Sequence, residues 1–367
     1  MTFEPTIFHY STMNSQSFAA LSNQIKHWGR ELGFQQVGIA DTDLKDAELH
    51  LDNWLDKGFN GDMDYMQRHG RKRSRPELLQ PGTRSVISVR MDYQTDSPQN
   101  MNEVLADPLA AYVSRYALGR DYHKLLRSRL QKLADKIQAE IGVFGYRVFT
   151  DSAPVMEKAL AEKAGLGWIG KHSNLINRKA GSWFFLGEIY TDLPLSVDAK
   201  ASPHCGDCTA CLAVCPTQAI VAPYQVDARL CVSYLTIELH GAIPEPLRPL
   251  IGNRIYGCDD CQIICPWNRF ARLSDEPDFN PRQRLNSQQL LAVFDWDEPT
   301  FLAKTEGSAI RRIGHHRWLR NIAVALGNAR ASALIIEKLQ NKLKHPSELV
   351  QEHVHWALTR QTQSVNK

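Results

Sequence analysis

The chain has 367 residues, of which 43% are hydrophobic and 23% are charged, and its formal net charge at pH 7 is +3. This composition is ordinary for a soluble globular protein, and the length is sufficient for two or three domains. No segment approaches the roughly 20 apolar residues of a membrane span. Residues 1–14 also lack the cationic start and the apolar run of a secretory signal. We therefore expect a cytoplasmic protein with no membrane partner.

The first half of the chain alternates between segments with helical periodicity and short runs typical of strands. Phe18, Leu21, Ile25 and Trp28, for example, recur at the spacing of an amphipathic helix. We expect helices over residues 17–32, 44–57, 121–141 and 154–163. We expect strands over residues 35–40, 85–89, 146–150, 172–176 and 183–190. Because strands and helices alternate up to about residue 192, the sequence predicts an α/β domain.

Asp151 is the best candidate for a functional acid in this domain. It follows the strand predicted at 146–150, and ligands gather at strand ends in α/β sheets. The alternative is a structural role, because Asp and Ser are ordinary capping residues and Pro154 suits the first turn of the next helix. The residues alone favour the capping role.

Residues 165–170 (GLGWIG) have the spacing of a dinucleotide-binding fingerprint. That fingerprint must follow a strand and open a helix, whereas here a helix precedes the run and a strand follows it. We interpret the run as a glycine-rich helix exit. We find no other flavin, nicotinamide or P-loop motif. The residues Asp121-Tyr122-His123 begin like the D-x-H-x-x-G motif that gives an axial histidine to a corrinoid, but the glycine is missing.

All eight cysteines lie between residues 205 and 265. They are Cys205, Cys208, Cys211, Cys215, Cys231, Cys258, Cys261 and Cys265. The first four have the C-x-x-C-x-x-C-x-x-x-C-P spacing of bacterial ferredoxins, in which three cysteines bind one iron–sulfur cluster and the fourth binds another. The last three repeat this run without its leading cysteine, whose position is occupied by Ile255.

The spacing predicts two 4Fe–4S clusters. Two clusters need eight thiolates, the two runs supply seven, and Cys231 is the candidate for the eighth. The rule that the fourth cysteine of a run binds the other cluster then divides the ligands. Cluster one takes Cys205, Cys208, Cys211 and Cys265, and cluster two takes Cys215, Cys231, Cys258 and Cys261. Zinc sites usually use separated pairs, and disulfides need an oxidising compartment, so both alternatives are disfavoured.

After Pro281 the chain turns helical. We expect helices over residues 287–294, 299–304, 316–326, 331–343 and 347–360. Such a succession of short antiparallel helices resembles a HEAT-like pair, although no strict repeat is visible. Residues 301–330 hold six Lys or Arg against one acid, and residues 115–147 hold eight against three. Basic segments can bind nucleic acid, but charge alone favours solvated helix faces.

Several segments together closely resemble the epoxyqueuosine reductase family. They are residues 115–123 (RYALGRDYH), 151–154 (DSAP), 161–168 (AEKAGLGW), 170–172 (GKH), both cysteine runs, 252–261 (GNRIYGCDDC) and 317–321 (RWLRN). The likeness extends from about residue 17 to 360. It implies reduction of the epoxide of epoxyqueuosine at the tRNA wobble position, which is the last step of queuosine synthesis.

The resemblance also implies cofactors, partners and domains. It implies base-off cobalamin in an α/β domain at residues 1–195, a ferredoxin-like domain with two 4Fe–4S clusters at 196–280, and a HEAT-like, tRNA-contacting domain at 281–367. The family shares the cobalamin–ferredoxin arrangement with reductive dehalogenases. We expect a monomer that binds the tRNA anticodon stem-loop and receives electrons from an external donor.

The family's catalytic acid falls on Asp151. We expect burial to raise the pKa of Asp151, so that the carboxyl group can donate a proton to the epoxide oxygen. The cobalamin pocket is expected to use Arg75, Ser114, Tyr116, Asp151, Lys171, Asn174 and Ser182.

For tRNA binding we expect Arg311, Arg312, Arg317 and Arg320. Arg311 and Arg312 precede a glycine and are expected to face outward, whereas Arg317 and Arg320 could pair with acids inside the helical domain.

Two other functions stay open from the sequence. One is a small-molecule reductase of the reductive dehalogenase kind, which would not need a basic helical tail. The other is a non-catalytic iron–sulfur electron-transfer module, which would lack cobalamin.

Overall fold

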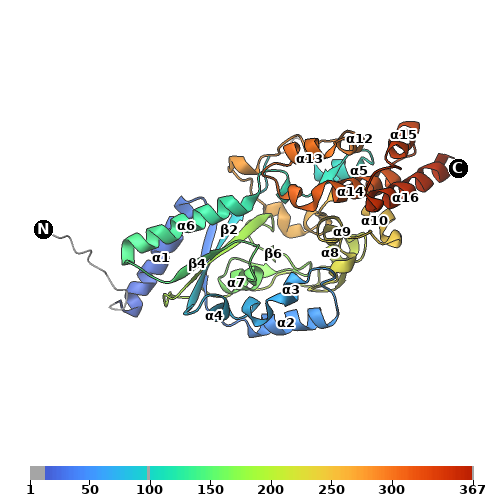
Figure 1. Ribbon diagram of the computed structural model, residues 1–367. Coiled ribbons are helices and arrows are strands. Elements are labelled where there is room, and N and C mark those ends of the chain that lie inside the picture. Colours follow the sequence, from blue (N-terminus) through green and yellow to red (C-terminus); the bar gives the residue numbers. More distant parts are fainter. Residues whose placement is uncertain (1–12, 97–99, 366–367) are drawn as a thin grey trace.

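The computed structural model describes residues 13–96 and 100–365 (Figure 1). A four-stranded sheet forms the centre of the first half of the chain, in the order β1-β2-β7-β4. Its strands are β1 (Gln36–Ala40), β2 (Ser85–Asp92), β7 (Phe184–Thr191) and β4 (Tyr146–Phe149). The mixed α/β fold expected from the sequence is confirmed. Alternating helices and strands usually accompany parallel sheets, but every neighbouring pair in this sheet is antiparallel.

Helices cover both faces of the sheet (Figure 1). On one face, α1 (Ser15–Glu31) and α6 (Tyr122–Ile141) lie side by side and bury apolar residues against alternate residues of β2, such as Ile87 and Val89. On the other face, α7 (Glu157–Lys163) packs in a cluster that includes Val86 of β2 and Tyr190 of β7. The alternation follows from the two-residue period of a strand.

Two local expectations were wrong near this sheet. The predicted strand at 172–176 is reduced to β6 (Leu175–Ile176), which pairs with β5 (Trp168–Ile169) inside the glycine-rich run. Pro154 does not lie in the first turn of α7, because that helix begins at Glu157 and residues 151–154 form a bend instead. The remaining helices of this region are α2 (Lys45–Asp56), α3 (Tyr65–Arg68), α4 (Pro76–Leu79) and α5 (Met101–Ala106).

The cysteine segment consists of short elements. They are α8 (Ala210–Val214), β8 (Ile220–Ala222), β9 (Gln225–Val226), α9 (Val232–Ile237), α10 (Arg248–Ile251), β10 (Arg254–Tyr256) and α11 (Asp260–Ile263). β10 pairs in parallel with β3 (Tyr112–Val113). This pairing joins the second cysteine run to the first half of the chain.

The last part of the chain is helical, as expected. Its helices are α12 (Leu290–Phe294), α13 (Glu298–Lys304), α14 (Gly314–Asn328), α15 (Ala333–Asn341) and α16 (Glu348–Val365). α14 is the central helix: it contacts α12 and α16, and it also packs on β10. No helix in the part of the chain that the structure describes is both long enough and apolar enough to cross a membrane.

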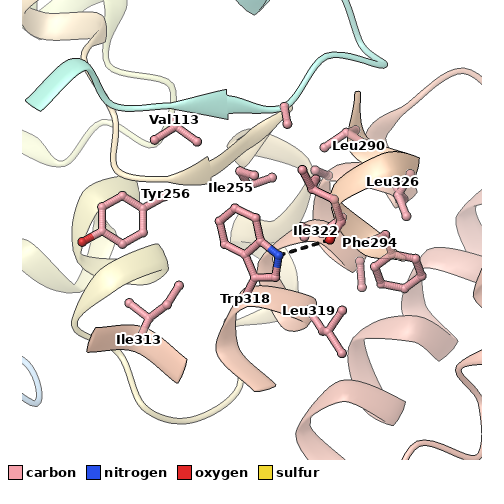
Figure 2. Packing of buried hydrophobic residues seen from close by; sticks show 14 of the residues in the cluster. Val113, Ile255, Tyr256, Leu290, Phe294, Ile313, Trp318, Leu319, Ile322 and Leu326 are labelled. Atoms are coloured by element: carbon pink, nitrogen blue, oxygen red, sulfur yellow. Dashed lines mark hydrogen bonds between the residues drawn. The ribbon is translucent and has the colours of Figure 1, made fainter. Parts of the chain in front are cut away.

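The helical part shares one hydrophobic core with distant segments (Figure 2). Trp318 of α14 is fully buried among residues that include Val113 of β3 and Ile255 of β10. Its indole nitrogen Nε1 donates a hydrogen bond of 3.2 Å to the carbonyl oxygen of Val293. The core therefore crosses the boundary predicted at residue 281.

Replacing Trp318 with alanine is expected to destabilise the whole protein, because it removes the largest side chain of this shared core. The expected cost is about 3–5 kcal/mol in the free energy of unfolding. Trp318→Phe is expected to cost less, since only the indole hydrogen bond and part of the volume are lost. Thermal unfolding followed by circular dichroism measures both, with exposed Leu334→Ala as the control. Equal melting temperatures for Trp318→Ala and the control would contradict the shared core.

Candidate active site

A central cavity of about 1000 Å³ lies where the three parts of the chain meet. Its wall contains residues of β7, the start of α6, the bend after β4, the cysteine segment and the turn before α14. Tyr93, Tyr116, Tyr122, Phe184 and Phe185 give it aromatic surface. The volume lies at the upper end of the range for small-molecule sites.

Asp151 lines this cavity, and its side chain is half-exposed. Its oxygen Oδ2 accepts a hydrogen bond of 2.6 Å from the Tyr122 hydroxyl and lies 3.2 Å from His123 Nε2. The residue has a φ of +52°, a left-handed conformation that Asp tolerates better than most residues. Asp151 does not cap α7, whose N-cap residue is Met156. The capping alternative is therefore wrong.

His123 joins two carboxylates. Its Nδ1 lies 2.6 Å from Asp121 Oδ1, while Nε2 faces Asp151. Burial lowers the pKa of His123, but the hydrogen bonds to Asp121 and Asp151 outweigh burial and raise it to about 9. The imidazole is therefore protonated at neutral pH and donates from both nitrogens.

The expected rise in the pKa of Asp151 is not found. Burial does raise the pKa of this carboxyl group, but the hydrogen bonds from His123 and Tyr122 lower it by more. Asp151 is consequently a carboxylate. Of its two donors, Tyr122 is nearer, but its pKa is raised well above the usual value, first by burial, so the more acidic proton belongs to His123. The sequence argument missed this because it considered burial without the neighbouring donors.

Two further carboxyl groups lie behind Asp151. Glu157 Oε1 accepts a hydrogen bond of 2.5 Å from the Asp151 amide. Burial, then the charge of Asp151, raises the pKa of Glu157 to about 7. Glu188 of β7 is fully buried, and burial followed by the charge of Glu157 raises its pKa well above the usual range. Glu157 is half-buried beside fully buried Glu188, and two neighbouring carboxyl groups cannot both ionise easily, so this pair retains a proton at neutral pH.

Five of the seven residues predicted to hold cobalamin line the central cavity: Ser114, Tyr116, Asn174, Ser182 and Asp151 itself. Two of their hydroxyl groups also support the second cysteine run. Ser114 Oγ donates to Asp259 Oδ1 at 2.6 Å, and Ser182 Oγ accepts from Gln262 Nε2 at 3.0 Å.

Arg75 and Lys171 do not line the central cavity. Arg75 is exposed and pairs with Glu48, 3.1 Å away, on the outer surface. Lys171 is buried, and its Nζ donates to the carbonyl oxygens of Gly206 at 2.6 Å and Cys208 at 3.0 Å. Both assignments are therefore corrected, because side-chain direction could not be read from the sequence.

The eight cysteines are free thiols and surround two cavities. Cys205, Cys208, Cys211 and Cys265 line a smaller cavity of about 200 Å³, which we term the outer cysteine cavity. Cys215, Cys231, Cys258 and Cys261 line the central cavity. Among the described residues, no group of three or more His, Cys, Asp or Glu side chains has an arrangement that could hold a single metal ion. The division into two groups of four matches the ligand sets that the spacing predicts.

The four predicted tRNA-binding arginines separate into two pairs. Arg311 and Arg312 line the central cavity and are exposed, and Arg312 forms an ion pair of 2.5 Å with Glu238. Arg317 and Arg320 instead donate to main-chain carbonyl groups, among them those of Ile237 and Leu235. These two hold α14 against the cysteine segment, so the expectation that they pair with acids was wrong, and we withdraw them as tRNA contacts.

Several functional candidates were missed from the sequence. Tyr122 and His123 were considered only as an incomplete corrinoid motif, although residues 115–123 belong to the resemblance described above. Their place in this family-like segment was the feature of the sequence that could have identified them. Glu157 and Glu188 carried no local signal, because their pairing depends on how α7 packs against β7.

Two family models match the chain. One, described as epoxyqueuosine reductase QueG, DUF1730, matches residues 73–152, and a 4Fe-4S double cluster binding domain matches residues 204–268. The epoxyqueuosine reductase of Pseudomonas aeruginosa is 62% identical over 343 residues, covering 93% of this chain and 95% of that protein. The Escherichia coli enzyme is 59% identical over 349 residues, covering 94% and 91%.

Solved structures are also similar. An epoxyqueuosine reductase with an epoxyqueuosine-modified tRNA-Tyr stem loop matches with a TM-score of 0.84 and 26% identity, covering 93% of this chain and 90% of that chain. The epoxyqueuosine reductase of Streptococcus thermophilus matches with a TM-score of 0.83 and 27% identity over the same shares.

The raised pKa of His123 predicts a pH-dependent contribution to stability. A histidine whose folded pKa is about 9 and whose ordinary value is 6.5 stabilises the fold fully below pH 6.5. The contribution is lost as the pH rises through 9. The difference in melting temperature between the protein and His123→Gln is therefore expected to be largest near pH 6.5 and to shrink towards pH 10. A difference that stays constant over this range would rule out the charged imidazole.

Proposed function

The chain belongs to the epoxyqueuosine reductase family, and we infer that it reduces the epoxide of epoxyqueuosine in tRNA to the alkene of queuosine. The supporting observation is the central cavity, because Asp151, Tyr122 and His123 line it together with four cysteines. A proton site and an electron-transfer site thus meet in one space. Converting an epoxide to an alkene consumes two electrons and two protons and releases water.

The electrons require the double cluster domain that the family model describes at residues 204–268. We propose that cluster one binds to the cysteines of the outer cysteine cavity and that cluster two binds to those of the central cavity, including Cys231. Cluster two is then the one beside the substrate. Trp168 Nε1 lies 3.4 Å from Cys205 Sγ, and the Ala219 amide lies 3.2 Å from Cys215 Sγ. Hydrogen bonds of this kind tune cluster potentials.

We propose that cobalamin occupies the central cavity. The residues fit such a group: the cavity is large, aromatic side chains line it, and Nε2 of buried His172 has no hydrogen-bond partner in the described part of the chain. Ser114, Tyr116, Asn174 and Ser182 would contact it. The base-off form is what the family resemblance implies, and it agrees with the missing axial-histidine motif. Bound there, cobalamin would supply a strongly reducing cobalt centre next to cluster two.

The chain's own residues supply the proton. As the epoxide oxygen gains negative charge, it needs a donor within hydrogen-bond reach. Asp151 lines the cavity, and its Oδ2 accepts a hydrogen bond from protonated His123, so a proton can pass from His123 Nε2 through the Asp151 carboxyl group to the epoxide oxygen. Glu157 positions Asp151 through its amide, and the Glu157–Glu188 pair holds a second proton nearby.

The tRNA is proposed to approach the side of the cavity where Arg311 and Arg312 lie. Arg120 and Lys124 also line this cavity and are exposed. These cations could bind the phosphates that flank the anticodon loop while the modified base leaves its stack and enters the cavity. A structural relative contains such a stem loop.

We further propose that residues 1–195 hold cobalamin, that 196–280 hold the clusters and that 281–367 contact tRNA. Packing of α14 against α16 supports a HEAT-like arrangement for the last part. The enzyme is proposed to act as a cytoplasmic monomer with an external electron donor.

Replacing Asp151 tests the proton route. Asp151→Asn preserves size but cannot carry a proton to the epoxide oxygen, so turnover is expected to fall by about 100-fold or more. Single-turnover assays with an epoxyqueuosine-containing stem-loop measure the effect. Iron content and cobalamin absorbance should match the unmodified protein. Asp135→Asn, an exposed change on α6, is the control. Turnover within a few fold of the control would exclude Asp151 from the route.

Replacing Cys231 tests the ligand sets. The unmodified protein is expected to hold about eight iron atoms in two 4Fe–4S clusters. Cys231→Ser should damage cluster two and largely spare cluster one, because Cys231 lines only the central cavity. Iron analysis and EPR of the reduced protein give the answer. Full iron with two unchanged EPR signals would remove Cys231 from the ligands.

Reversing two charges tests the tRNA surface. Arg311→Glu with Arg312→Glu is expected to weaken stem-loop binding and to reduce its salt dependence by about one unit of slope for each lost phosphate contact. Both clusters should persist, since both arginines are exposed and neither is among the predicted cluster ligands. Exposed Arg330→Glu is the control. If affinity and salt dependence match those of the control, the RNA lies elsewhere.

A further inference from the structure

The two groups of cysteines differ in their access to solvent. Cys208 of the outer cysteine cavity is exposed, whereas none of the four cysteines of the central cavity is exposed. Residues 206–209, the loop that carries Cys208, are exposed as well. If the clusters are bound as proposed above, electrons from outside reach cluster one first and cluster two afterwards.

Aromatic side chains connect the outer cysteine cavity to the surface. His204 and Trp267 line this cavity, and each ring centre lies 5.0 Å from that of buried Trp168. Phe270 lies 5.9 Å from Trp267, and 40% of it is exposed. An apolar contact surface therefore borders the exposed cysteine loop.

Positive charge surrounds this apolar surface. Arg269 lines the outer cysteine cavity and stacks over Phe270 at 4.7 Å. Arg178 and Lys179 are exposed on the neighbouring turn, which is joined to the Arg269 segment by the 2.6 Å hydrogen bond from the Ser182 amide to Asn268 Oδ1. In the described part of the chain, none of these three cations forms an ion pair with an acid.

A buried charge adds to this field. Lys171 lines the outer cysteine cavity and is fixed by its bonds to the carbonyl groups of Gly206 and Cys208. Asp207 is the acid in the exposed loop itself. Cations therefore outnumber acids where the cysteine loop meets the solvent.

We propose that this outer face, made of residues 204–209, 178–179 and 267–270, docks a small acidic protein that delivers one electron at a time. The proposal rests on the proposed function, since it assumes cluster one in the outer cysteine cavity. Cluster one would fill that cavity of about 200 Å³, so the donor has to stay on the surface. Unpaired cations around an apolar centre suit a transient, charge-steered complex with an acidic partner.

The test uses the cluster-loaded protein and reduced flavodoxin, a small acidic flavoprotein, as the probe. In Arg178→Glu with Arg269→Glu, reduction of the clusters by flavodoxin in stopped-flow absorbance is expected to slow by about tenfold at low ionic strength. The difference should largely vanish at high ionic strength. Calorimetric affinity for flavodoxin should fall in parallel. Reduction by dithionite, which needs no docking, should be unchanged.

Controls separate the possible causes. Arg84→Glu with Arg330→Glu reverses two exposed cations outside the outer face and should leave the flavodoxin rate unchanged. Because Arg269 lines the outer cysteine cavity, Lys179→Glu alone is the second variant, and it should slow the flavodoxin reaction without changing the dithionite reaction. Unchanged flavodoxin rates in both outer-face variants would overturn the proposal. Equal slowing with dithionite, or loss of stem-loop affinity in place of flavodoxin affinity, would also overturn it.

The proposed function has a separate readout. Protein reduced with dithionite should convert an epoxyqueuosine stem-loop at the same rate with or without the outer-face substitutions. A docking proposal that fails would leave this conversion intact. Absence of conversion in the unmodified, fully loaded protein would instead count against the function.

Discussion

A single buried carboxylate joins the parts of this protein. Asp259, between two cysteines that line the central cavity, accepts hydrogen bonds from the Tyr112 hydroxyl at 2.8 Å, Ser114 Oγ at 2.6 Å and the Arg115 amide at 2.8 Å. Burial raises the pKa of Asp259 although these bonds oppose the rise. The bonds fix the second cysteine run against β3, and both the cavity wall and the shared core depend on that attachment. A misplaced carboxylate here would leave a buried charge without partners, which is costly.

The central cavity combines opposite electrostatic requirements. Electron transfer to a substrate builds negative charge on it, so the site must keep a proton bound until that charge develops. Asp121 and Asp151 keep His123 protonated, and the neighbouring Glu157–Glu188 pair keeps a proton by excluding a second negative charge. Tyr122 is stacked between His123 and Phe185, with ring centres 4.3 Å and 3.8 Å away. The aromatic stack orients both donors towards Asp151 before any substrate arrives.

Local patterns predicted much of this structure, and non-local pairing explains what they missed. Helical periodicity located α1, α6 and α14, since one apolar stripe is enough to specify each helix. Cysteine spacing divided the thiols into two groups because ligand number and run order constrain them. Strand direction, the reach of Arg75 and Lys171, and the contact between His123 and Asp151 depend on packing between segments far apart in sequence. The left-handed turn at Asp151 likewise has no sequence signature of its own.

The core shared by Trp318, Val113 and Ile255 has a consequence for the modularity of the chain. Asn321 of α14 donates to the carbonyl oxygens of Thr236 and Ile255, so main-chain groups of the cysteine segment are satisfied only by the last helices. A chain shortened at residue 281 would expose Ile255 and leave those carbonyl groups without their partner. The helical part could therefore not be removed by truncation, or replaced by gene fusion, as an independent domain. The redox and helical parts thus form one folding unit.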